Sequence, residues 1–269
     1  ADSENHLMAL MERIVFRPYM PAGYPLEKLD LDAVKVPEGD ALQVAALDLV
    51  RAVGRYQDMK KEGSRDFAEY EQLAKRFEAA ANTAATKEAA PIMQILATNY
   101  MGLAKLQLSY NEAQDNDKKA ELKKNGLAAF EKVAVLASQY ETADAPLWQG
   151  FSLFNAARIN PDPERALAQM QLAVATRRKW LDAGIKPQYV QDGLTNEYLY
   201  AAASLVKMDE TMPLHEVGKY GDEWLALKRD GVPPLAASAK IWQEIYSPEE
   251  GIYAKRVKTG KVNPPALSL

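Results

Sequence analysis

The sequence contains almost none of the histidine and cysteine side chains on which most zinc and haem sites depend. Only two histidines occur, His6 and His215; they lie in different expected helices, and the chain has no cysteine to complete a metal site with either. Zinc and haem sites both need several such side chains that converge on one point. We interpret the two histidines as surface or capping residues and predict no metal ion.

The stretch DNDKKAELKKNG, which begins at Asp115, starts like a calcium-binding loop. Lys119 and Ala120 stand where that loop needs an oxygen ligand and a glycine, and Gly126 replaces its closing glutamate. The chain also contains neither a phosphate-binding glycine loop nor a G-x-S-x-G elbow. We therefore predict no catalytic residue and no cofactor, and we expect a protein that is not an enzyme.

The chain contains many large side chains that could contact a ligand: thirteen Tyr, nine Met and four Trp. Ligand binding is therefore the function that we consider next. Most of these side chains are interpreted as the core of packed helices, and the rest as the lining of a cavity or groove. Tyrosine and tryptophan combine an apolar body with a polar tip, and methionine adapts to irregular shapes. The predicted ligand-binding residues are Met93, Tyr100, Met101, Trp148, Phe151, Phe154, Tyr198 and Tyr200.

Tyr198 and Tyr200 are two residues apart in the stretch NEYLYAAA, so they point to different faces of a helix. In a simple two-layer array both cannot lie in the core. We expect one of the two to face a groove or a partner.

The elements that must position these side chains are helices, because alanine is abundant and no hairpin signal separates alternating runs. Asp162 followed by Pro163 marks one helix start, with an N-cap and proline at the first helical position. Prolines in RPYMPAGYP and NPPALSL predict irregular segments near both ends. The helices are expected at residues 4–16, 41–60, 65–81, 90–110, 117–140, 146–158, 163–183, 188–208, 213–228 and 235–246.

Three of these helices loosely fit a pattern of a small residue, a large one four positions later and a small one three positions after that, although Leu73 stands at the first small position of one of them. The positions are Leu73, Phe77 and Ala80; Gly126, Phe130 and Val133; and Ala166, Met170 and Ala173. Two preceding helices carry a partial large-x-x-Leu-small signature: Tyr100, Leu103 and Ala104, and Trp148, Phe151 and Ser152. The pattern resembles tetratricopeptide repeats, which implies antiparallel helix pairs in a degenerate superhelical array. An unrelated helical bundle is the alternative, since any close helix pair favours small residues at the crossing.

This pattern divides the chain into an N-terminal helix and proline-rich segment at residues 1–40, a helical-repeat core at 41–228, and a C-terminal helix and basic tail at 229–269. The net charge of −4 gives no electrostatic reason to expect nucleic acid. The chain contains no cysteine, which fits an oxidising compartment, and it begins with Ala1 rather than Met. We expect a periplasmic protein, and a lipid anchor before Ala1 or attachment to the outer membrane is left open.

An exported array of such helix pairs with an aromatic and Met-rich interior is similar to two bacterial families. One is the periplasmic T component of TRAP-type transport systems, and the other is the helical component of bacterial sterol transport. The resemblance implies a carrier that binds a sterol or other lipid and moves it between membranes. It also implies two partners, a membrane transporter and a second periplasmic binding protein.

The alternative function is a protein-binding scaffold in an envelope complex, because helical arrays present concave faces to partners. On that view the exposed aromatic residues are interface anchors. The basic residues near the C-terminus would then steer an acidic partner. They are Lys255, Arg256, Lys258 and Lys261.

Overall fold

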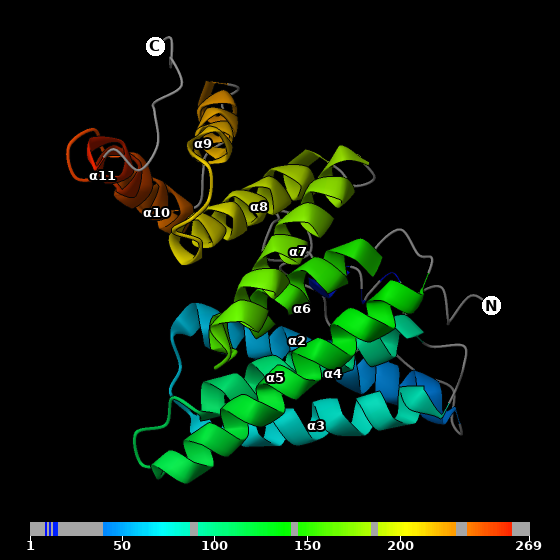
Figure 1. The fold of residues 1–269 in the computed structure, drawn as a ribbon. Helices are drawn as coiled ribbons and strands as arrows, with labels where there is room; N and C mark the ends of the chain where they lie inside the picture. Colours follow the sequence, from blue (N-terminus) through cyan, green and yellow to red (C-terminus); the bar gives the residue numbers. More distant parts are fainter. Residues whose placement is uncertain are drawn as a thin grey trace. The chain divides into compact units, whose positions relative to one another are not determined.

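The computed structural model describes Ala9, Met11 and residues 13–15, 40–86, 91–140, 145–183, 188–229 and 236–259. These residues form helices and contain no strand, which confirms the all-α prediction (Figure 1). No helix in this part of the chain is long and apolar enough to cross a membrane. The helices are α2 (Ala41–Glu62), α3 (Phe67–Ala85), α4 (Pro91–Leu108), α5 (Asn116–Gln139), α6 (Ala145–Ile159), α7 (Pro163–Asp182), α8 (Gln188–Met208), α9 (Leu214–Arg229), α10 (Ala236–Tyr246) and α11 (Ile252–Lys258).

Each helix from α2 to α10 overlaps a predicted one, whereas α11 was not predicted and lies in the expected basic tail. Most of the first expected helix and the end of the tail lie outside the described residues. Aspartate side chains begin several helices by accepting from free backbone N–H groups of the first turn. Asp162 accepts from Glu164 and Arg165, which confirms the predicted N-cap before Pro163.

The chain divides into two compact units, which we call unit 1 (Ala1–Asn160) and unit 2 (Pro161–Leu269). The boundary falls inside the span of residues 41–228 that the sequence predicts to be one repeat core. Within each unit, helices pack mainly on their neighbours along the chain. The tetratricopeptide-like superhelix stays a prediction.

Four aromatic rings form the centre of unit 1 where α2, α3 and α4 meet. The Tyr56 ring lies 5.8 Å from that of Tyr70 and 5.5 Å from that of Tyr100, both edge-on, and Phe77 lies 5.6 Å from Tyr100. The Gln57 amide donates to the Tyr100 hydroxyl at 3.2 Å. Burial raises the pKa of Tyr100 to about 12, so this hydroxyl stays protonated at neutral pH.

Two glycines bring α4 and α5 into close approach. A Cβ atom on Gly126 would lie 3.3 Å from the backbone oxygen of Gly102, and a Cβ on Gly102 would lie 2.8 Å from the Phe130 ring. Phe130 itself is fully buried. Gly126 and Phe130 therefore occupy the small and large positions that their spacing predicts for a helix crossing.

Unit 2 is built around α8, which packs on α7, α9 and α10. Trp242 on α10 is fully buried and stacks on Tyr246 with ring centroids 4.8 Å apart. Arg256 on α11 donates to the backbone oxygens of Val206 at 3.2 Å and Asp209 at 2.8 Å. These oxygens lie at the carboxyl end of α8, where carbonyls lack partners within the helix. Arg256 thus ties α11 to the end of α8.

We expect Arg256→Met to lower the free energy of unfolding by about 1.5–3 kcal/mol, the usual contribution of hydrogen bonds to a charged group. The substitution keeps the apolar stem and removes the donors from the two α8 carbonyls. Urea denaturation of the full chain measures the loss. Lys255→Met, one residue earlier at an exposed position, is the matched control and should change little. Equal effects of the two substitutions would contradict the capping role.

Candidate functional site

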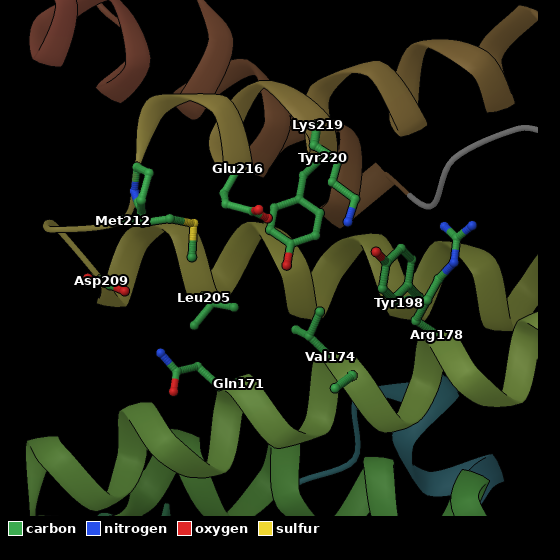
Figure 2. A pocket seen from close by; sticks show the side chains of 12 residues that line it. Gln171, Val174, Arg178, Tyr198, Leu205, Asp209, Met212, Glu216, Lys219 and Tyr220 are labelled. Atoms are coloured by element: carbon green, nitrogen blue, oxygen red, sulfur yellow. The ribbon is translucent and has the colours of Figure 1, made fainter. Parts of the chain in front are cut away.

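A pocket of about 410 Å³ opens in unit 2 among α7, α8, α9 and the turn that joins α8 to α9 (Figure 2). The register of each helix brings its residues to the same space, because positions three and four apart share a helix face. The lining residues are Gln171, Val174, Ala175 and Arg178 of α7, Tyr198 and Leu205 of α8, Asp209, Met212 and Pro213 of the turn, and Glu216, Lys219 and Tyr220 of α9.

The inner surface of the pocket is apolar. Val174, Leu205 and Met212 are buried there, and the rings of Tyr198 and Tyr220 lie 6.4 Å apart in an edge-to-face arrangement. Aromatic and aliphatic surface of this kind favours an apolar ligand body. Ala175 on α7 also lines the pocket and is exposed, so solvent reaches the pocket at this position.

Glu223 on α9 holds two of the lining residues in place. One carboxylate oxygen accepts from the Tyr198 hydroxyl at 2.8 Å, and the other accepts from Nη1 of Arg178 at 2.8 Å. The Arg178 guanidinium also lies 5.7 Å from the centre of the Tyr198 ring, and Figure 2 shows the two side chains side by side. Burial raises the pKa of Tyr198, and Glu223 raises it further, so Tyr198 remains a hydrogen-bond donor.

Charges of both signs surround the opening. The Asp209 carboxylate accepts from the backbone N–H and the hydroxyl of Thr211 at 2.9 and 2.7 Å. Glu216 lies beside Tyr220 in Figure 2. Burial raises the pKa of Tyr220, and the negative charge of Glu216 raises it further. Lys219 is exposed and forms no ion pair with any described residue. The pocket can therefore hold an apolar body and also hydrogen-bond a polar end.

No group of three or more His, Asp or Glu side chains that could hold a metal ion occurs among the described residues. The arrangement around the pocket is one of hydrogen bonds and ion pairs that fix side chains. It contains polar tips suited to orienting a bound molecule.

Of the predicted ligand-binding residues, Tyr198 lines this pocket and Tyr200 lies half-buried further along α8. The remaining six lie in unit 1, on α4 and α6. Tyr100 belongs to the aromatic cluster of unit 1. The other five are Met93, buried on α4, half-buried Met101 on the same helix, and Trp148, Phe151 and Phe154 on α6. None of these six residues is in the lining of the unit 2 pocket, and their role in binding stays a prediction.

The α6 residues make local contacts of their own. The Trp148 and Phe151 rings lie 6.2 Å apart, and the Arg158 guanidinium lies 5.5 Å from the centre of the Phe154 ring. Trp148 and Phe154 are buried and Phe151 is half-buried. These contacts are typical of core and rim packing in a helical unit.

The sequence did not predict the polar lining residues Arg178, Glu216 and Tyr220, or Glu223 of α9, which holds Arg178 but does not itself line the pocket. A signal was present on α9, because Glu216, Tyr220 and Glu223 follow one another at spacings of four and three and so share a face. Two carboxylates flanking a tyrosine on one face indicate a surface that orients side chains or ligands. Arg178 had no comparable signal, since its partner Glu223 is 45 residues away.

The basic tail is partly engaged within unit 2. Arg256 caps α8, and Lys258 donates to the backbone oxygen of Glu249 at 3.3 Å. Lys255 is exposed, and Lys261 lies outside the described residues. An acidic partner for this tail stays a prediction.

Comparison of the chain with protein-family models, curated protein sequences and solved structures found no match. The pocket and its chemistry are therefore the basis for inferring function.

Proposed function

We propose that the protein is a non-enzymatic carrier that binds a hydrophobic small molecule in the pocket of unit 2. The observation that carries the proposal is the combination of a buried apolar wall with an ordered polar one. Val174, Leu205 and Met212 form the first, and Tyr198 and Arg178, both held by Glu223, form the second. Pockets of this composition are the usual form of small-molecule sites.

The size and polarity of the pocket favour a sterol or another lipid with one polar end. A volume of about 410 Å³ lies within the range of small-ligand pockets, roughly 300–1,000 Å³. Burying about 300 Å² of apolar ligand surface contributes roughly 7 kcal/mol at about 25 cal/mol per Å². The costs of association reduce this to an affinity of about 1 µM or weaker, which suits a carrier that must release its cargo.

The cellular setting belongs to the same proposal. The absence of cysteine and the resemblance to periplasmic transport components support a location in the periplasm. There the carrier would work beside a membrane transporter and a second periplasmic binding protein.

Filling the pocket with a bulky side chain should weaken binding without unfolding the protein. Ala175 lines the pocket and is exposed, so Ala175→Trp places an indole in the opening and leaves the buried wall intact. We expect the wild type to bind a sterol, a fatty acid or a phospholipid below about 100 µM and the variant to bind at least about tenfold more weakly, a difference of about 1.4 kcal/mol. Displacement of a fluorescent lipid measures both affinities.

The control is Ala168→Trp, an exposed position two turns earlier on α7 that does not line the pocket. Both variants should keep the melting temperature of the wild type. Failure of all three lipid classes to bind would overturn the proposal. Equal loss of binding in the two variants would place the ligand elsewhere and overturn it as well.

A further inference from the structure

A second pocket, of about 680 Å³, lies in unit 1 where α2 and α4 end. The segment that joins α2 to α3 and the turn that follows α4 complete its walls. Its lining includes two cationic side chains, Lys60 and Arg65, and three aromatic ones, Phe67, Tyr70 and Tyr110. None of these residues belongs to the lipid pocket proposed above.

Backbone N–H groups of the chain itself cap the helix ends at this pocket. The N–H of Gly63, whose φ of 65° is left-handed, donates to the Lys60 oxygen, and the N–H of Ser64 donates to the Met59 oxygen at 2.9 Å. At the end of α4 the N–H of Tyr110 donates to the Gln107 oxygen at 3.0 Å. These three carbonyls have partners already, so they do not depend on the Lys60 and Arg65 side chains for hydrogen bonds.

The nearby carboxylates do not neutralise the two cations. Glu69 and Glu62 both pair with Arg55, at 2.6 and 3.9 Å. Neither Lys60 nor Arg65 forms an ion pair within the described part of the chain. Glu112 is the acidic residue in the lining, and its side chain is exposed to solvent.

The surroundings of Lys60 disfavour its positive charge. Lys60 is exposed at the surface, but partial burial of its side chain lowers its pKa, and the positive charge of Arg158 lowers it further. A bound anion would act in the opposite direction and stabilise the ammonium form.

Two further groups can donate hydrogen bonds at this pocket. The Asn111 carboxamide oxygen accepts from the Ala113 N–H at 3.0 Å, which leaves the amide NH₂ as a donor. The Ser64 hydroxyl oxygen accepts from the Asp66 N–H at 3.2 Å, which leaves its own proton to donate. Together with the two cations, these groups favour an acceptor-rich ligand.

The aromatic side chains add flat apolar surface beside the charges. Tyr110 is 53% exposed, Phe67 is half-buried, and Tyr70 is buried with its ring against that of Tyr56. An exposed tyrosine next to unpaired cations offers a ring face to a planar ligand and a charge to its substituent.

We propose that this pocket binds a small aromatic anion, with its carboxylate or other oxyanion between Lys60 and Arg65 and its ring against Phe67 and Tyr110. This is a second ligand site, of a chemical class different from the apolar cargo of unit 2. It does not depend on the carrier function proposed for that unit.

Isothermal titration calorimetry with three compounds of one shape tests the charge preference. The compounds are 2-naphthoate, neutral 2-naphthamide and cationic 2-naphthylmethylammonium, each titrated into the full chain in an amine buffer with chloride. We expect the anion to bind at least about tenfold more tightly than the amide, and the cation to bind least. Equal binding of anion and amide, or tighter binding of the cation, would overturn the proposal.

Matched variants locate the binding. Arg65→Gln should weaken 2-naphthoate about five- to tenfold and leave the weaker naphthamide binding unchanged, whereas Lys132→Gln, at an exposed position on α5, should change neither. If Lys132→Gln weakens the anion as much as Arg65→Gln, the attraction is a general charge effect and the site is wrong. The Ala175→Trp variant of unit 2 should bind 2-naphthoate like the wild type, which separates failure here from failure of the carrier proposal.

A spectroscopic readout reports on Lys60 without changing it. The ¹³Cε resonance of Lys60, followed over pH, should show its pKa rise when 2-naphthoate is added. An unchanged Lys60 titration at saturating anion would exclude direct contact and overturn the assignment.

Discussion

Gly126→Leu should lower the free energy of unfolding by about 3 kcal/mol, the upper end of the usual cost of overpacking. A Cβ atom at this position lies 3.3 Å from the backbone oxygen of Gly102 and 3.9 Å from the backbone nitrogen of Leu106. Backbone atoms cannot rotate aside as a side chain can, so α4 and α5 must move apart to admit the leucine. Urea denaturation of the full chain measures the effect.

The control is Gly218→Leu, because a Cβ on this α9 glycine meets no heavy atom within 4 Å. Leucine has the higher helix propensity, by about 0.8 kcal/mol, so this variant should be as stable as the wild type or slightly more so. If Gly126→Leu leaves the midpoint unchanged, the close approach of α4 and α5 is not real.

Phe77→Ala should have the larger effect, a loss of about 3–5 kcal/mol. Phe77 is fully buried among α2, α3 and α4, with its ring 6.4 Å from Tyr56 and 5.6 Å from Tyr100. Truncation removes the apolar contacts and leaves a cavity bounded by rigid rings, which cannot collapse easily.

Two further variants serve as comparisons for Phe77→Ala. Phe77→Leu retains most of the volume and should cost less than half as much, while Phe67→Ala, at a half-buried site on the same helix, should also cost less. Chemical denaturation compares all three. Similar losses for Phe67→Ala and Phe77→Ala would show that the aromatic cluster contributes no more than partly exposed surface.

The limits of the long helices could be predicted because local chemistry determines them. Asp162 and Pro163 begin α7 through interactions within its own first turn. Helix α11 could not be predicted in this way, since it has seven residues and its N-cap, Gly251, offers no side-chain hydrogen bond. Its Arg256 contacts carbonyls 47 and 50 residues earlier, and such a contact leaves no local pattern.

The candidate site was harder to predict than the helices, as two tyrosines illustrate. Tyr100 and Tyr198 are both buried on long helices, and each follows a polar residue and precedes an apolar one in the sequence. Other rings fill the space around Tyr100, whereas Tyr198 borders a pocket and donates to Glu223. Periodicity indicates which face of a helix is buried, but the residues that lie opposite come from distant parts of the chain.

The packing of consecutive helices has a consequence for how the chain acquires its structure. In unit 1, α2 packs on α3, α3 on α4, α4 on α5 and α5 on α6, so most of the packing joins segments of short sequence separation. Low contact order is associated with folding in microseconds to milliseconds, because each step closes only a short loop. We therefore expect unit 1 to assemble helix by helix as it emerges during synthesis, before α7 is complete. In unit 2, α10 packs on α8 although α9 lies between them in the sequence. Unit 2 therefore cannot complete its packing until α10 has been made, and it should be the slower of the two to fold.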